Sequence, residues 1–226
     1  MGRSLLYFLP YYLVSLMYAC LVNTDNLVLS VVAIESPQYT LVRSESDLEI
    51  RLYGESSWMS ALVPGATTFE KSTKDGFHRL YQYIHGGNLD HSRITITAPV
   101  LTSINSSSSL GSNYSVSFYL PAKYLGSLPQ PNPELNLQLN KWRSHCIAVR
   151  KFSGFAKDEN INKEIDALIT SLNKQVTGTA AILQDRNYYS IAQYNASNQL
   201  SGRLNEVWID VTGFTVEGCP GYQGKY

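Results

Sequence analysis

The chain has 226 residues, enough for one substantial hydrophobic core or for two fused half-domains. Its 18 Lys and Arg residues balance 18 Asp and Glu residues, so the chain lacks the basic excess by which proteins bind nucleic acid. Aromatic residues, mostly tyrosine, make up 12% of the chain, which indicates an ordered, β-rich protein and argues against a disordered one.

Residues 1–33 differ in character from the rest of the chain. Arg3 precedes an apolar run over residues 5–22, and a second apolar patch ends in a small-residue site at Ala33. These are the features of a signal peptide, so we predict that residues 1–33 direct secretion and are removed. Two alternatives stay open. Cleavage after Ala19 is one, and an uncleaved membrane anchor is the other, because the apolar run is just long enough to span a bilayer.

Export changes what the cysteines are expected to do. Cys20 is removed with the signal peptide, which leaves Cys146 and Cys219 in the mature chain, residues 34–226, as one possible disulfide pair in an oxidising compartment. The alternative is two unpaired thiols, one buried as a small hydrophobic residue and the other on a frayed terminus.

Three Asn-x-Ser/Thr triplets are candidate glycosylation sites, at Asn105, Asn113 and Asn195. Asn105 lies in the Ser-rich stretch 103–109, which we expect to be an exposed loop, so it is the best acceptor of the three. Asn113 is expected at a strand edge and Asn195 in a turn. We predict that at least Asn105 is glycosylated if the chain enters the secretory pathway.

Strands around one helix are predicted between Pro37 and Leu120. Alternating apolar and polar residues mark strands at 39–43, 48–53, 58–63, 94–96 and 114–120. Pro64-Gly65 is expected to stop the third of these strands. Thr67 and Glu70 then have the spacing of a capping box at the helix start, and Gly86-Gly87 supplies the left-handed stop at its end.

The two faces of this helix differ in chemistry. One face is an apolar stripe at helical spacing, made of Thr73, Phe77, Leu80 and Ile84. The opposite face carries a cation, two imidazoles, a phenol and an amide in place of ordinary Glu/Lys pairs: Lys74, His78, Tyr81, Gln82 and His85. This polar and aromatic face is the candidate binding surface of the chain. The alternative is an ordinary solvated helix face.

The same order of elements recurs after a proline-rich connector between Pro121 and Pro133. Strands are predicted at 135–139, 146–152, 188–194 and 206–211. Between them a helix begins at Asp158, its N-cap, and has one apolar face made of Ile161, Ile165, Leu168, Ile169 and Leu172. The repeated order predicts two half-domains, about 38–120 and 134–212, that form one closed or nearly closed antiparallel sheet with both helices packed outside.

Four segments, in this order, resemble the SOUL haem-binding protein family. They are F-x-x-L-Y-x-Y-I-x-G-x-N from Phe77 with the I-x-I-T-A-P-V that follows it, Ser117–Pro121, Val149–Ala156 and Asn205–Trp208. The resemblance covers about residues 38–212 and is to exported, plant-type members. It implies an α+β fold, a distorted eight-stranded antiparallel β-barrel with two long helices and duplicated halves, related to bacterial small-molecule effector-binding domains. It also implies haem or a metal-free porphyrin as the ligand.

A porphyrin needs a broad apolar or aromatic surface for its plane and cations for its propionates. Phe77 and Tyr81 are suited to the first role. Lys74 matches a cation that the family carries at this place in the helix. Tyr81-Gln82 stands where the family has Met-Lys, and Gln199 stands about where a second rim lysine is found, so two positive charges of the family pattern are missing here.

The axial ligand is a further departure from the family pattern. Some members have a histidine, proposed as the iron ligand, where this chain has Leu52, which cannot ligate iron. His78, His85 and Tyr81 stay open as substitutes. His78 and His85 are seven residues apart, about 10 Å along a helix, so the two do not share one metal ion.

We therefore expect a secreted, non-enzymatic protein that binds a tetrapyrrole reversibly in a shallow groove on the first helix, without stable membrane insertion once the signal is cleaved. No Walker loop, nucleophile elbow or zinc-protease motif is present. One alternative is an enzyme of small planar molecules in which Glu206 and a tyrosine do acid–base work between the half-domains. Glu206 is otherwise structural, with Arg203 as a candidate ion-pair partner. A surface interaction protein without a ligand is the third possibility.

Overall fold

The computed structural model describes residues 34–66, 68–106, 112–124, 127–175, 188–195, 199–212, 214 and 216–220. The predicted signal peptide lies outside these residues, together with its alternatives of cleavage after Ala19 and of a membrane anchor. Within the described ranges, no helix has both the length and the apolar character needed to cross a bilayer.

The described residues form one antiparallel sheet and two long helices. The strands are β1 (Tyr39–Ser44), β2 (Glu49–Tyr53), β3 (Ser56–Ala66), β4 (Val100–Asn105), β5 (Ser112–Tyr119), β6 (Leu137–Trp142), β7 (His145–Ser153), β8 (Tyr188–Gln193) and β9 (Leu204–Asp210). The helices are α2 (Phe69–Ile84) and α3 (Asp158–Gln175), with short 3-10 turns at Ala122–Tyr124 and Pro133–Leu135 in the connector. Nine strands in this part of the chain, rather than eight, form the sheet.

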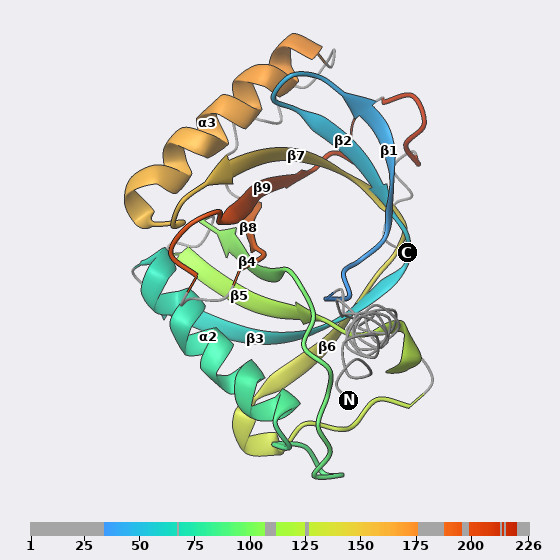
Figure 1. Ribbon diagram of the computed structural model, residues 1–226, viewed down its shortest axis with the longest axis vertical. Coiled ribbons are helices and arrows are strands. Elements are labelled where there is room, and N and C mark those ends of the chain that lie inside the picture. The colour runs from blue at the N-terminus through green and yellow to red at the C-terminus, as the bar shows by residue number, and fades with distance from the viewer. Residues whose placement is uncertain are drawn as a thin grey trace, which may run out of the picture. The chain divides into compact units, whose positions relative to one another are not determined.

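The strand order shows how the two halves combine. The sheet runs β1-β2-β7-β9-β8-β4-β5-β3-β6, so each half keeps three of its own strands together on either side of the β8–β4 pair. The remaining strands cross over, because β2 pairs with β7 of the second half and β6 pairs with β3 of the first. Figure 1 shows the result, a curled half-barrel with α2 and α3 both on its outer face. The predicted α+β class and duplicated architecture are confirmed, while the half-domain boundaries stay a prediction.

Two strand predictions are wrong in position. Residues 94–96 do not form a strand, and β4 begins only at Val100, after the cis Ala98–Pro99 bond. Pro64 does not stop β3, which continues to Ala66. The pairing with β6 ends at Ala61 and the register with β5 shifts after Val63, so Pro64 lies where the ladder needs no N–H from it.

Both helices pack on the sheet through the faces that the sequence predicts. On α3 the side chains of Ile161, Ile165, Leu168 and Leu172 are buried, and Ile169 packs against the same core. On α2, Leu80 and Ile84 are buried and Phe77 is partly buried against the β3–β5 core. Gly76 brings α2 close to the sheet, because a Cβ at this position would collide with Val116 of β5. Gly86, with φ 104°, closes the helix as expected.

The N-termini of the two helices cap each other. The carboxylate of Asp158 accepts hydrogen bonds from the backbone N–H of Phe69 at 2.8 Å and of Glu70 at 3.4 Å. In return, the Glu70 carboxylate accepts from the N–H of Asp158 at 3.2 Å. The predicted capping box is therefore wrong: the N-cap of α2 is Thr68, Thr67 lies outside the described residues, and Glu70 serves the other helix. Asp158, likewise, caps α2 instead of its own helix.

The predicted disulfide is confirmed. Cys146, fully buried in β7, is bonded to Cys219, with a Cα–Cα distance of 5.8 Å. It holds the segment that follows β9 against the α3 side of the sheet, where Phe214 and Val216 join the core.

The structure describes only the first part of the Ser-rich stretch, and this part is not a loop. Residues 103–105 belong to β4, where Ser103 is buried and its hydroxyl lies 2.8 Å from that of Ser190 in β8. Asn105 is the half-buried last residue of this strand, while residues 107–111 lie outside the described ranges. Asn105 therefore lies at a strand end and not in an exposed loop.

The other two sequons also lie close to strands. Asn113 belongs to β5, and Asn195 follows β8. The Asn195 side chain already donates to Gln199 at 2.9 Å and accepts from the N–H of Leu204 at 2.6 Å, so it closes the β8–β9 connection. Glycosylation of any of the three stays a prediction.

Candidate functional site

Five of the six α2 residues that the sequence singles out lie on the outer face of the helix, and the sixth, Phe77, lies at the border with the core. Phe77 is half-buried, and the other five side chains are exposed to solvent: Lys74, His78, Tyr81, Gln82 and His85. Tyr81 keeps 43% of its surface exposed. The helix thus presents its polar and aromatic face outward, as predicted, while the opposite face forms core.

Three of the rings form a row along the helix, which we call the aromatic row (Phe77, Tyr81 and His85). The i, i+4 spacing puts the rings in line, with centroids 5.9 Å apart for Phe77–Tyr81 and 3.9 Å apart for Tyr81–His85. The last two rings are stacked at 26°. Phe77 also meets Phe118 of β5 edge-on at 5.5 Å, so the row is anchored in the core at one end and open to solvent at the other.

Lys74 differs from the other cations of α2 in its contacts, because its charge acts on Asp75 only without a direct ion pair. Lys71 pairs with Asp75 at 2.6 Å, and its hydrogen bond holds the pKa of the Asp75 carboxyl below its usual value. Arg79 donates to the carbonyl of Leu62 at 2.6 Å. Within the described residues, the Lys74 ammonium makes neither an ion pair nor a hydrogen bond. It is therefore available to an anionic group that lies beside the aromatic row.

Gln199, the position equivalent to a second rim cation, does not extend this surface. Its side chain is occupied within its own loop, where it accepts from Asn195 and donates to the carbonyls of Ser201 at 3.1 Å and Gly202 at 3.4 Å. The surface on α2 consequently offers a single unpaired cation.

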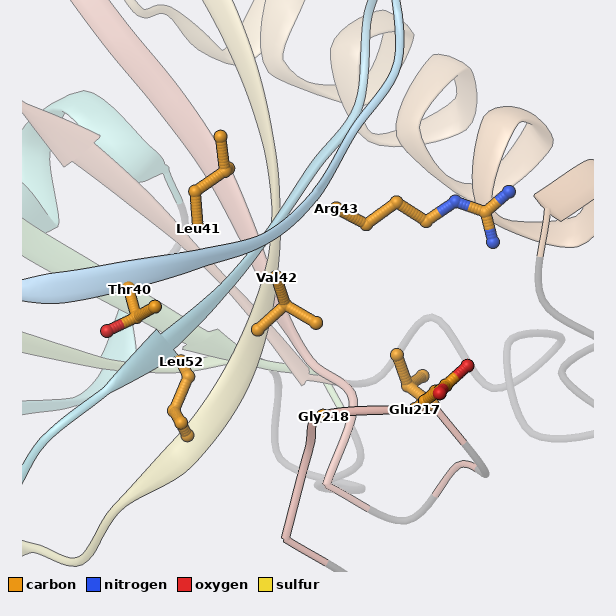
Figure 2. A pocket seen from close by; sticks show the side chains of 8 residues that line it. Thr40, Leu41, Val42, Arg43, Leu52, Glu217 and Gly218 are labelled. Carbon is orange, nitrogen blue, oxygen red and sulfur yellow. The ribbon is translucent and has the colours of Figure 1, made fainter.

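A half-open pocket of about 430 Å³ lies elsewhere, between β1 and the segment that the disulfide holds (Figure 2). Its wall is mostly aliphatic, with one residue of each charge: Thr40, Leu41, Val42, Arg43, Leu52, Val216, Glu217 and Gly218. None of the six α2 residues lines it. Leu52 does, so the position where some family members carry a histidine faces this pocket and belongs to the α3 side of the core.

Glu206 forms the centre of a buried polar network. Its carboxylate accepts from Arg51 at 2.8 and 3.1 Å, from the Tyr194 hydroxyl at 2.7 Å and from the Trp208 indole at 2.8 Å. Burial, with the Glu206 charge adding to it, raises the pKa of Tyr194 well above its ordinary value. Arg51, which also donates to Tyr53 at 3.1 Å, is the partner, so the expected pairing with Arg203 is wrong.

This network is structural in character. Both carboxylate oxygens already accept from protein donors, and an Arg–Glu pair with each side chain 2% exposed has no opening for a substrate proton. The sequence hints at a buried role for Arg51, because this charged residue stands between Ile50 and Leu52 on a predicted strand. Nothing local indicates that its partner lies 155 residues away.

Arg203, the expected partner, has a different role. It donates to the carbonyl of Gln199 at 2.8 Å and lies 4.3 Å over the Phe155 ring. Within the described residues, no three or more His, Cys, Asp or Glu side chains gather in a way that holds a metal ion.

Comparison with known proteins gives the family. The sequence profile described as SOUL heme-binding protein matches residues 34–210. Heme-binding protein 2 of Mus musculus is 28% identical over 163 residues, which cover 71% of this chain and 76% of the relative, and the Homo sapiens protein gives the same values. Heme-binding protein 1 of Xenopus laevis is 27% identical over 165 residues, or 71% and 82% of the two chains. Among solved structures, the C-terminal domain of EcmrR is similar with a TM-score of 0.47 and 9% identity, over 76% of this chain and 96% of that one. Because the profile spans well over half of the sequence, this chain belongs to the SOUL haem-binding protein family.

Proposed function

We propose that this chain is an exported, non-enzymatic protein that binds haem or a metal-free porphyrin reversibly on the exposed face of α2. The observation that carries the proposal is the aromatic row beside the unpaired Lys74 ammonium. A tetrapyrrole is a flat, largely apolar ring with two carboxylates at one edge, so a row of rings that is open to solvent at Tyr81 and His85, next to an unpaired cation, matches both of its parts.

The expected affinity follows from how shallow this surface is. A ligand that covers one side of the row removes on the order of 200 Å² of apolar surface from water, worth roughly 5 kcal/mol before the costs of association. One exposed ion pair adds about 0.5–1 kcal/mol. Since a micromolar dissociation constant needs about 8 kcal/mol of net binding free energy, these contacts alone predict weaker, readily reversible binding, which suits a carrier better than a permanent holder.

Three observations support the absence of catalysis and the export of the chain. The carboxylate that was the best candidate acid, Glu206, is saturated by Arg51, Tyr194 and Trp208. The relatives reported above are named as haem-binding proteins. The Cys146–Cys219 disulfide suits an oxidising compartment, as expected for a chain that leaves the cytosol.

The test is a titration of the disulfide-bonded protein with haemin and with iron-free protoporphyrin, followed by absorption and fluorescence. Lys74→Glu replaces an attraction by a repulsion at the rim, so we expect the dissociation constant of both ligands to rise about 5- to 10-fold. Lys163→Glu is the matched control, because Lys163 is exposed on α3 and the substitution changes the net charge by the same amount.

A second control distinguishes the α2 surface from the pocket. Thr40→Trp fills the pocket from an exposed position on β1 and leaves α2 untouched. We expect wild-type affinity from this variant. If Thr40→Trp weakens binding while Lys74→Glu does not, the ligand lies in the pocket and the proposed site is wrong.

A further inference from the structure

The two imidazoles on the proposed binding surface are not equivalent. Nδ1 of His85 lies 2.9 Å from the backbone carbonyl oxygen of Tyr81. A carbonyl oxygen only accepts hydrogen bonds, so Nδ1 must carry the proton. In the neutral ring the lone pair is then on Nε2, the atom free to bind a metal. Within the described residues, His78 makes no hydrogen bond that selects one tautomer.

The His85 ring is also held in orientation. It is the C-cap residue of α2, and its ring stacks on that of Tyr81 with 3.9 Å between centroids. A backbone hydrogen bond at one nitrogen that orients the ring and fixes its tautomer is the arrangement that usually supports a metal-ligating histidine. In this chain that arrangement coincides with the exposed aromatic row.

We propose that Nε2 of His85 is an axial ligand of haem iron on this surface. The inference rests on the proposed function and adds to it the group that distinguishes an iron porphyrin from a metal-free one. Leu52, on a different side of the core, supplies no ligand atom, so the surface of α2 provides its own.

The two ligands differ in one contact. Haem on this surface would gain a bond from its iron to Nε2 of His85, in addition to contacts with the Tyr81 ring that is stacked on His85. Metal-free porphyrin lacks this bond, and its affinity depends on ring contacts and on Lys74 alone.

His145 provides the control for this argument. Its Nδ1 lies 2.7 Å from the carbonyl oxygen of Arg143, so its tautomer is fixed in the same way. Its ring, however, packs edge-on against Trp142 at 5.0 Å and lies 6.4 Å from Tyr53, within a different aromatic cluster. A fixed tautomer without the α2 surface is therefore available for comparison.

The experiment compares haemin and protoporphyrin on four proteins: wild type, His85→Ala, His78→Ala and His145→Ala. With reduced haem, we expect an iron–histidine stretching band in the resonance Raman spectrum of wild type, His78→Ala and His145→Ala. His85→Ala should lose that band, regain an imidazole-ligated absorption spectrum when free imidazole is added, and bind haemin about tenfold more weakly. Its dissociation constant for protoporphyrin should rise less, about two- to threefold, because that ligand loses one ring contact of the aromatic row and no bond to iron.

Nitrogen-15 NMR of the ligand-free protein gives a second readout, in which neutral His85 should show the Nδ1–H tautomer. A wild-type Raman spectrum from His85→Ala overturns the ligand assignment and leaves the proposed function standing. Equal loss of haemin and protoporphyrin binding in that variant also overturns it, because His85 would then act as part of the surface. If wild type binds neither porphyrin, the proposed function itself fails.

Discussion

The two long helices occupy equivalent places in the duplicated fold, yet only one has an unusual outer surface. Each follows a long strand, packs on the outside of the half-barrel and is capped by the other at its N-terminus. The exposed residues of α3 are ordinary polar ones: Glu159, Asn162, Lys163, Thr170, Asn173 and Lys174. Those of α2 include Tyr81 and two histidines. Since α3 packs as well without exposed rings, the fold does not require them on α2, which points to a role in binding.

The largest expected effect is on the free energy of unfolding and comes from the buried faces that both helices have. Leu80 of α2 and Leu168 of α3 are both 0% exposed, each at the centre of a separate core. We expect Leu80→Ala and Leu168→Ala to lower the free energy of unfolding by about 3 kcal/mol each, through lost transfer energy and the cavity left behind. Urea denaturation followed by circular dichroism measures both. A cost below 1 kcal/mol at either position would contradict the equivalence of the two buried faces.

The disulfide belongs to the α3 side of the core and has no counterpart on the α2 side among the described residues. Replacing Cys146 and Cys219 by Ala should lower the free energy of unfolding by about 2–4 kcal/mol, because the crosslink spans 73 residues of the chain. Hydrogen exchange should accelerate in β7, α3 and the segment after β9, and much less in α2. Haemin affinity of the variant should stay at the wild-type value, since Phe77, Leu80 and Ile84 of α2 belong to a different core cluster from Cys146. Faster exchange in α2 equal to that in α3 would contradict this.

Asp158 and Glu70, which cap each other's helices, contribute to stability with opposite dependence on pH. Burial favours a higher pKa for Asp158, but hydrogen bonds from Glu70 and from the N–H of Phe69 outweigh it and lower the pKa. Its contribution to stability is therefore present above the ordinary value of 3.8 and is lost as the pH falls through the lowered pKa. The adjacent Asp158 carboxylate raises the pKa of Glu70, whose contribution is present below 4.5 and is lost as the pH rises through the raised value.

Thermal melting between pH 2 and pH 7 tests this pair. We expect Asp158→Asn to lower stability at pH 7 by about 1–2 kcal/mol and to remove part of the acid-induced loss. Glu70→Gln should remove the small gain in stability on acidification from neutral pH. Identical pH profiles for Glu70→Gln and wild type would show that Asp158 does not raise the pKa of Glu70.

The sequence predicts well what depends on local periodicity and poorly what depends on distant partners. The buried faces of both helices follow from 3.6-residue spacing, and eight of the strands follow from alternation or apolar runs. Residues 103–105 belong to the serine-rich stretch 103–109, whose composition suggests a loop, but the Ser103 hydroxyl is satisfied inside the sheet by that of Ser190. Composition does not report a partner 87 residues away.

The candidate site shows the same division. The exposed face of α2 is a helical pattern and is visible in the sequence. Whether His78 or His85 is held in a fixed tautomer depends on the helix end and on ring stacking, which the sequence does not show. The Arg51–Glu206 pair joins strands of different halves that meet because β2 crosses to β7, so a nearer arginine, Arg203, was the wrong choice.

Substitution of Tyr81 is expected to have a small effect on stability and a large effect on ligand binding. Because the ring is 43% exposed and outside the buried clusters, Tyr81→Ala should change the free energy of unfolding by less than about 1 kcal/mol. The same substitution should weaken protoporphyrin binding about tenfold, since it removes the middle of the aromatic row. Thr170→Ala, at an exposed position on α3, should change neither quantity measurably. A cost of 2 kcal/mol or more from Tyr81→Ala, with unchanged porphyrin affinity, would mean that the ring serves the fold, and the difference between the helices would then carry no functional meaning.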